Sequence, residues 1–545
     1  MNKIAFIPIQ IYFKYEKSLR FSVKRIVLPF IFTILCKISV FSQNTDYDLP
    51  NIIYVLVDDM GYGDVQAFNS NGKIPTPNIN RLAQEGMKFT DAHTSSAVCT
   101  PTRYGILTGR YNWRSPLKSN TLVGNSSALI PTNRTTIASL LKRKNYNTAF
   151  IGKWHLGWDW QYKNENSDST AVNYWKGKPL GDIDFSRKIL NSPNDLGFDY
   201  MYGIAASLDM APYVYVENSY VVEVPDKLTE GIGKYGWWRS GPTSTNFVHQ
   251  EVTPLLFEKS YGYIKEKANK SSPFFLYLAL PSPHTPILPT PEWQGKSHLN
   301  PYGDFIMEID SYVGKLVKLL ETMGVSKNTL IVFTSDNGCY SGAGIDEMKE
   351  KGHSPSYVYR GSKADIYEGG HREPFIIKWP AMVSAGKTSE ATICTTDFMA
   401  TCADILDIKL ADDEGEDSFS LMPLMLGKNS KGYQRTYTVH HSINGSFAIR
   451  QGDWKLIFCP GSGGWSNPRP NSNAEKSLPK YQLYNLVNDP GERDNLYAKY
   501  PKIISKLKKL MQEGVVNGRS TLGINQENDL PMDGKKWTQI ETIFN

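Results

Sequence analysis

The strongest constraint on the fold is a repeated alternation of short apolar segments with longer helical patterns. The apolar segments span residues 52–57, 148–151, 274–280 and 330–334. Helical patterns cover 77–86, 135–144, 255–267 and 302–323. The first apolar segment reads Ile-Ile-Tyr-Val-Leu-Val and has no alternating polar face, which is typical of a strand buried on both sides. The alternation therefore predicts an α/β fold with a mostly parallel sheet flanked by helices.

The pattern changes near residue 430. Beyond it, strand-like runs cover 435–440, 447–450, 454–458 and 482–486, and an amphipathic helix is expected near 503–512. We therefore predict a main domain at 43–430 and a smaller C-terminal antiparallel-sheet subdomain at 431–545. Residues 160–250 are rich in Asn, Gly, Tyr and Trp with little periodicity, and we expect them to form long loops around a substrate cleft.

The N-terminal residues 1–42 have the pattern of a signal peptide. A basic region ends at Lys24-Arg25, and an apolar stretch follows at 26–35. The alternative is an anchoring helix, for which this apolar core is short, so we expect no stable membrane anchor. The predicted location is secreted or periplasmic. Seven of the 60 Lys and Arg and one of the 54 Asp and Glu lie in 1–42, which leaves 53 of each. A neutral mature chain argues against nucleic-acid binding.

Polar residues follow each of the predicted strands. Asp58-Asp59 follows 52–57, Lys153 and His155 follow 148–151, His284 follows 274–280, and Asp336-Asn337 follows 330–334. In an open α/β sheet, ligands bind at the carboxyl edge, where the ends of parallel strands meet. Four such clusters at one edge predict a site.

Four of these side chains carry oxygen donors, namely Asp58, Asp59, Asp336 and Asn337. Oxygen ligands suit a hard cation such as Ca²⁺ or Mg²⁺ and match Zn²⁺ poorly. For either pair alone, turn chemistry is an equal alternative, because Asp and Asn often end strands by bonding to local backbone groups.

Cys99 begins the sequence Cys-Thr-Pro-Thr-Arg-Tyr-Gly-Ile-Leu-Thr-Gly, which ends at Gly109. A single Cys is by default a buried thiol. The whole segment, however, resembles the C-x-P-x-R-x4-T-G signature of type I sulfatases. The resemblance implies that a maturation enzyme oxidises Cys99 to formylglycine (3-oxoalanine), whose hydrated aldehyde attacks sulfur. It also implies an alkaline-phosphatase-like fold, a sulfatase catalytic domain at 43–430 and a sulfuric ester hydrolase.

Further motifs support the same resemblance. Residues 152–157, Gly-Lys-Trp-His-Leu-Gly, resemble a second signature of this family, and His284 and Lys363 also match family positions. The resemblance implies these catalytic residues: Cys99, Arg103, Lys153, His155, His284 and Lys363. His155 would handle a formylglycine hydroxyl proton, and His284 is the candidate proton donor to the leaving oxygen. The implied metal ligands, for Ca²⁺ rather than Mg²⁺, are Asp58, Asp59, modified Cys99, Asp336 and Asn337.

The remaining cysteines do not define a pattern of disulfide bonds. Cys36 lies in the predicted leader, and one or two disulfides could form among Cys339, Cys394, Cys402 and Cys459 in an oxidising compartment. The sequence cannot pair them.

The predicted substrate is a sulfated oligosaccharide or polysaccharide, such as a fragment of ulvan or carrageenan, with glycosaminoglycan or mucin sugars as alternatives. Aromatic faces suit sugar stacking, and we consider Trp237, Trp238, Tyr213 and Tyr215 for this role. The pair His371-Arg372 departs from many relatives and could bind a saccharide group or form a surface salt bridge. Two other functions stay open: a phosphonate or phosphodiester hydrolase of the same superfamily, and a non-catalytic protein that binds sulfated glycans.

Overall fold

The computed structural model describes residues 48–163, 180–427, 432–532 and 534–544. The predicted signal peptide at 1–42 lies outside these residues. Residues Leu49–Asn545 form one compact unit. Within the described ranges, no helix has both the length and the apolar character needed to cross a membrane.

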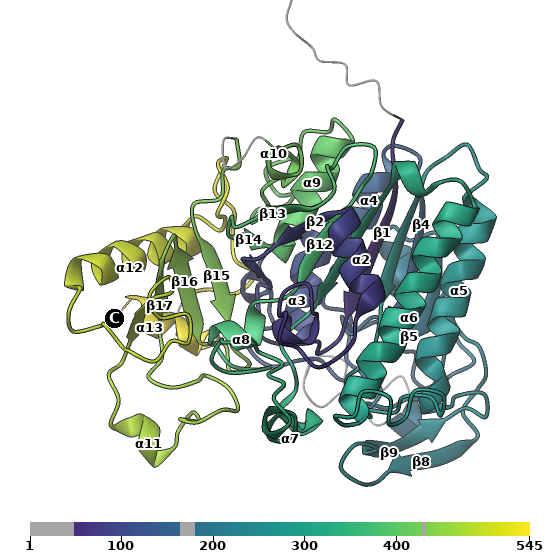
Figure 1. Ribbon diagram of the computed structural model, residues 1–545, viewed down its shortest axis with the longest axis horizontal. Helices are drawn as coiled ribbons and strands as arrows, with labels where there is room; N and C mark the ends of the chain where they lie inside the picture. The colour runs from purple at the N-terminus through teal and green to yellow at the C-terminus, as the bar shows by residue number, and fades with distance from the viewer. Residues whose placement is uncertain (1–47, 164–179, 428–431, 533, 545) are drawn as a thin grey trace, which may run out of the picture. The chain divides into compact units, whose positions relative to one another are not determined.

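A sheet of ten strands forms the centre of this unit (Figure 1). Its middle is parallel, in the order β11 (Thr329–Ser335), β1 (Asn51–Val57), β10 (Phe274–Ala279), β4 (Asn147–Lys153) and β5 (Tyr200–Ile204). Beyond β11 the sheet continues through antiparallel pairings with β12 (Phe375–Lys378) and β2 (Met87–Phe89), and β13 (Lys387–Ser389) then pairs with β2 in parallel. Beyond β5 it continues through the antiparallel strands β6 (Val216–Glu217) and β7 (Tyr220–Val221). The prediction of a mostly parallel sheet is confirmed.

Helices cover both faces of this sheet. Successive side chains of β1 point to opposite faces, and each face packs against a different set of helices. Ile53 packs into the apolar core that includes residues of α2 (Pro77–Glu85), α5 (Val252–Lys267) and α6 (Pro301–Thr322). Tyr54 faces the other way, where its ring centroid lies 4.9 Å from that of Phe398 in α9 (Phe398–Ile405). The helices α3 (Cys99–Thr108) and α4 (Ile137–Lys142) pack with α9 on this second side. Shorter helices are α7 (Ile345–Glu350), α8 (Glu368–His371) and α10 (Met422–Met425).

A separate antiparallel sheet follows in the C-terminal part. Its strands are β15 (Thr438–His441), β16 (Phe447–Gln451), β17 (Trp454–Ile457) and β18 (Gln482–Asn485), in that order. The helix α12 (Pro501–Val516) buries Leu507 and Met511 against Phe447 of this sheet. Two short helices complete this part, α11 (Asn473–Lys476) and α13 (Glu541–Phe544). The predicted antiparallel sheet and helix are present, and the boundary at residue 430 stays a prediction.

The fold differs from the sequence analysis in the region 180–250 and at the cysteines. Residues 180–250 are not loops alone, because β5 joins the main sheet and β8 (Lys227–Gly231) pairs with β9 (Trp238–Thr243). Buried and exposed residues do not alternate regularly along either strand of this hairpin, so the sequence carries no apolar period there. A further short pair joins β3 (Ala92–His93) to β14 (Ile393–Cys394). The four candidate disulfide cysteines, Cys339, Cys394, Cys402 and Cys459, are all free thiols, and each is buried as a small core side chain.

Candidate active site

The parallel strands bring their terminal polar residues to one edge, as predicted. Asp58 and Asp59 follow β1, Asp336 and Asn337 follow β11, and Lys153 ends β4. All five side chains are buried. His284, beyond the end of β10, keeps 11% of its side chain exposed.

Three ion pairs hold the buried carboxylates of this edge. The Lys153 Nζ donates to the Asp58 Oδ2 at 2.5 Å, and the Lys363 Nζ donates to the Asp59 Oδ1 at 2.6 Å. The Arg103 guanidinium donates to the Asp336 Oδ2, at 3.0 Å from Nε and 2.8 Å from Nη2. Three carboxylates thus face three cations, and their charges cancel when all are ionised.

The electrostatics of these groups follow from burial and neighbouring charge. Burial raises the pKa of Asp58, but Lys153, His284 and Arg103 together hold this pKa well below its ordinary value. Burial and the nearby Asp58 carboxylate raise the pKa of Asp336 to about 7. Burial lowers the pKa of Lys363, but Asp59 more than reverses this effect, so the ammonium stays charged. A divalent cation beside the carboxylates would favour the ionised form of each.

Unpaired oxygen atoms identify where such a cation fits. Among the described residues, Asp58 Oδ1, Asp59 Oδ2 and Asn337 Oδ1 are buried and have no hydrogen-bond partner. The Asn337 Nδ2 donates to Asp59 Oδ1 at 2.7 Å, which fixes the amide so that its own oxygen stays free. Asp59 has a positive φ of 67°, an uncommon backbone conformation for a non-glycine residue. This oxygen donor set fits a hard divalent cation.

Cys99 is the first residue of α3 and is only 2% exposed. Arg103 lies one turn further along the same helix, so both side chains lie on the same face. The Thr100 hydroxyl donates to the His155 carbonyl at 2.9 Å and ties α3 to the segment after β4. Burial raises the pKa of the Cys99 thiol despite the opposing charges of Lys153 and Lys363. The unmodified thiol is therefore a poor nucleophile at neutral pH.

The two predicted site histidines have different hydrogen bonds. The His155 Nε2 donates to the Leu122 carbonyl at 2.8 Å, whereas its buried Nδ1 has no partner in the described part of the chain. Burial and Lys153 lower the pKa of His155 well below its ordinary value, so the ring is neutral and its Nδ1 carries an unshared electron pair. The His284 Nδ1 donates to the Thr285 carbonyl at 2.7 Å, and its Nε2 lies 3.8 Å from Asp59 Oδ2.

Most of the aromatic residues considered for sugar stacking are not available for it. Tyr213 and Tyr215 are buried, and Trp238 stacks on His249 with ring centroids 3.9 Å apart. Trp237 is 43% exposed and is the one of the four that presents its ring to solvent. The sequence could not distinguish these cases, because all four lie in one aromatic-rich region without periodicity.

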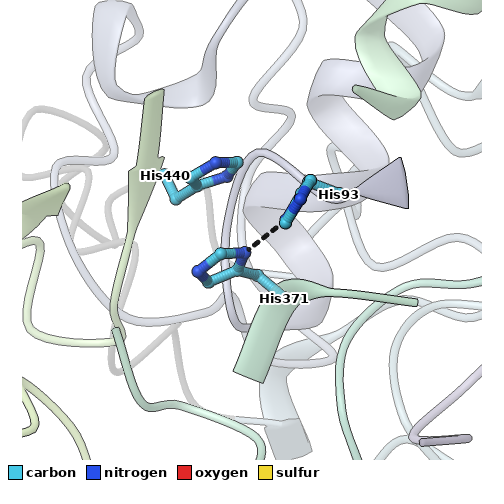
Figure 2. Close-up of side chains that lie close together, drawn as sticks. All are labelled: His93, His371 and His440. Atoms are coloured by element: carbon cyan, nitrogen blue, oxygen red, sulfur yellow. Dashed lines mark hydrogen bonds between the residues drawn. The ribbon is translucent and has the colours of Figure 1, made fainter. Parts of the chain in front are cut away.

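The pair His371-Arg372 does not lie on the surface either. Arg372 forms ion pairs with Asp91 and Glu368, and His371 is fully buried in a histidine cluster with His93 and His440 (Figure 2). The prediction that this pair binds a saccharide or forms a surface salt bridge is therefore wrong, because both side chains make buried contacts within the protein. The three rings come from β3, α8 and β15, so the cluster joins the C-terminal sheet to segments that precede it in the chain.

Every ring nitrogen of this histidine cluster has a protein partner. His93 Nδ1 and His371 Nδ1 lie 3.1 Å apart, and the His371 and His440 rings stack with centroids 4.1 Å apart. The outer nitrogens of His93 and His371 reach Asp91 and Lys455, and those of His440 reach the Thr94 carbonyl and the Thr438 hydroxyl. The cluster is thus a satisfied polar network rather than a metal site.

Two groups near His284 have no counterpart in the sequence analysis. Asp209 follows β5 and has one oxygen 3.9 Å from His284 Nδ1. On another side, the ring of Tyr340 lies 6.5 Å from that of His284 and contacts Trp465 of the C-terminal part at 5.8 Å. No motif marks these residues, and only the fold brings them beside His284.

Comparisons with known proteins agree with this geometry. The family model described as Sulfatase matches residues 50–408. The chain belongs to the sulfatase family. An N-acetylgalactosamine-6-O-sulfatase of Bacteroides thetaiotaomicron is 32% identical to this sulfatase over 506 residues, covering 85% of this chain and 92% of the relative.

Solved structures extend the comparison to the fold. A structure concerned with metabolism of multiple glycosaminoglycans by Bacteroides thetaiotaomicron superposes with a TM-score of 0.72 at 31% identity, covering 86% of this sulfatase and 99% of that chain. Ps i-CgsB in complex with k-i-k-neocarrahexaose gives a TM-score of 0.66 at 24% identity, covering 91% and 98%, a likeness in fold. The fold is alkaline-phosphatase-like, and the sulfatase is a sulfuric ester hydrolase, as predicted.

Proposed function

We propose that this sulfatase removes sulfate from a sulfated glycan outside the cytoplasm, with Cys99 converted to formylglycine by a separate maturation enzyme. The observation that carries the proposal is the buried edge where Cys99, three cation–carboxylate pairs and two histidines meet. The similarity to an N-acetylgalactosamine-6-O-sulfatase favours a sulfated amino sugar or a related galactose sulfate. Ulvan and carrageenan fragments stay as predictions within the same substrate class.

The environment of Cys99 supports its modification. A fully buried thiol with a raised pKa forms little thiolate, which is the reactive form of cysteine. A formylglycine hydrate would instead supply an oxygen nucleophile together with a second hydroxyl through which the sulfate can be released. The charged residues around position 99 suit an anionic substrate, because Arg103, Lys153 and Lys363 all lie within this edge.

The metal proposal rests on the free oxygens of the site. Asp58, Asp59 and Asn337 each offer an unpaired oxygen, and with Asp336, whose oxygens already accept from Arg103 and the Asp59 main chain, they would hold Ca²⁺ together with the modified side chain of residue 99. The ion would neutralise negative charge on the sulfuryl oxygens. Because the protein charges of the edge already cancel, a bound divalent cation gives the site a net charge of about +2. An anionic sulfate ester would therefore be attracted into the site.

The two histidines divide the proton transfers in this proposal. His155 would accept a proton through its unpaired Nδ1, since its Nε2 is held by the Leu122 carbonyl. His284 would donate a proton to the departing sugar oxygen from its Nε2, since its Nδ1 is held by the Thr285 carbonyl. Each ring thus has one nitrogen fixed by the backbone and the other directed into the site, which suits general acid–base catalysis.

Cys99 provides the test of this function. Protein expressed with a sulfatase maturase should release sulfate from sugar sulfates, and the peptide with residue 99 should show the mass of formylglycine. The Cys99→Ala variant should fold normally but lose turnover, because one small buried side chain replaces another. Wild-type turnover by protein that carries an intact Cys99 thiol would contradict the mechanism. Faster hydrolysis of phosphonate esters than of any sulfate ester would favour the alternative enzyme, and no turnover by mature protein would favour the binding protein.

A further inference from the structure

Asp209 is a buried carboxylate beside the active site with an unused oxygen. It lies five residues after the end of β5, which runs parallel to β4, so it emerges at the same sheet edge as Lys153. Its side chain is only 7% exposed. Among the described residues, the Oδ1 atom has no hydrogen-bond partner, although leaving a buried charged oxygen unpaired is costly.

Arg239 binds the other oxygen of the Asp209 carboxylate. Its Nη1 donates to Asp209 Oδ2 and, at 3.0 Å, to the Asp209 main-chain carbonyl. The Arg239 side chain is 50% exposed and lies over the ring of Trp237, at 5.1 Å from the centroid. The pair therefore fixes Asp209 Oδ2 and leaves Oδ1 in a defined position near His284.

His284 does not account for the free oxygen. The distance between His284 Nδ1 and Asp209 Oδ1 is 3.9 Å, which is too long for a hydrogen bond, and the Nδ1 proton is already donated to the Thr285 carbonyl at 2.7 Å. The other nitrogen of the same ring lies 3.8 Å from Asp59 Oδ2. Only the imidazole ring of His284 therefore lies between Asp209 and Asp59. A sugar whose sulfate group binds at the carboxylate edge could place one of its own hydroxyls at Asp209.

We propose that Asp209, oriented by Arg239, is a specificity-determining residue that accepts a hydrogen bond from a free hydroxyl of the sulfated sugar ring. The inference rests on the proposed action on sulfated sugars. A carboxylate that lacks a donor favours a substrate with a hydroxyl at this place over one with hydrogen or a second sulfate there. Simple aryl sulfates have no such hydroxyl and cannot make the contact.

The test compares mature Asp209→Ala with the wild type on a sulfated sugar and on 4-methylumbelliferyl sulfate. The kcat/KM for the sugar sulfate should fall by roughly 10- to 150-fold, the range for losing a hydrogen bond to a charged group, and the value for the aryl sulfate should change little. Arg239→Met should give a smaller loss of kcat/KM, again for the sugar sulfate only. It serves as the second variant if Asp209→Ala folds poorly, because the Arg239 side chain is half exposed. The control is Asp199→Ala at the opposite end of β5, which loses an exposed ion pair with Lys142 and two hydrogen bonds from Thr148 and should alter neither value.

Sugar sulfates with single hydroxyls replaced by hydrogen sharpen the result. One such analogue should be slow for the wild type and no slower for Asp209→Ala, because the partner of the carboxylate is already missing. Equal losses of Asp209→Ala on the sugar and aryl sulfates, or no loss on either, would overturn this inference while the proposed function stands. A wild type that cleaves no sulfated sugar would overturn the proposed function and this inference with it.

Discussion

Replacing Asp58 by Asn tests whether its carboxylate is a metal ligand as well as the partner of Lys153. The substitution keeps the shape of the side chain but leaves the buried Lys153 ammonium without its partner at 2.5 Å. Breaking a buried ion pair by removing one charge costs about 3–5 kcal/mol. In a chelator, we therefore expect the free energy of unfolding of Asp58→Asn to fall by about this amount.

A matched control separates this structural cost from the loss of a ligand. Asp417 forms a fully buried, two-pronged ion pair with Arg114, with both distances 2.8 Å, and Asp417→Asn should cost a similar free energy in the chelator. Calcium at 100 times its Kd stabilises a folded protein by about 2.7 kcal/mol. The wild type and Asp417→Asn should both gain this amount.

Asp58→Asn should gain much less from the same calcium. If the lost ligand weakens binding by about 100-fold, that calcium concentration equals the Kd of the variant, and the gain falls to about 0.4 kcal/mol. The measurement is the midpoint of denaturant unfolding, followed by tryptophan fluorescence in calcium and in chelator. Equal calcium gains for Asp58→Asn and Asp417→Asn would refute the assignment of Asp58 as a ligand.

Two further predictions concern histidines. His284→Ala should slow hydrolysis of a sugar sulfate by up to roughly 10²–10⁴-fold more than that of an activated aryl sulfate, because only the sugar is a poor leaving group; parallel losses in the two kcat/KM values would instead make His284 a sulfate-binding residue. Burial keeps the pKa of His440 well below its ordinary value in the folded state, and the neighbouring His93 and Lys455 add to this effect. Below about pH 6.5 the unfolded state therefore binds more protons than the folded state. The free energy of unfolding should therefore fall with acidification, and His440→Asn should reduce its slope against pH by about 1.4 kcal/mol per unit; an unchanged slope between pH 5 and 6.5 would contradict a neutral His440.

The sequence was sufficient to predict the residues that share the carboxyl edge of the sheet. Asp58 and Asp336 could be placed together because parallel strands end side by side, a relation that depends only on strand order. Lys363 follows no strand of the parallel sheet, and its assignment needed the family motif. The structure adds that its ammonium reaches Asp59.

Other features depend on packing that the sequence does not encode locally. His371 was considered as a saccharide ligand, yet it lies beside His93 and His440, residues 278 and 69 positions away in the chain. Asp209 carries no motif, and its importance depends on contacts with Arg239 and His284 that form only after folding. Such contacts between distant segments cannot be predicted from periodicity or spacing.

The burial of Cys99 has a consequence for the order of events during synthesis. Its thiol is buried at the start of α3, so the proposed maturation enzyme could not reach it in the folded chain. If Cys99 is modified as proposed, modification and folding compete in time, and each molecule that folds first keeps an unmodified thiol. The fraction of active molecules in a preparation would then record the ratio of two rates, and slowing the folding of the chain while the modifying enzyme is present should raise that fraction.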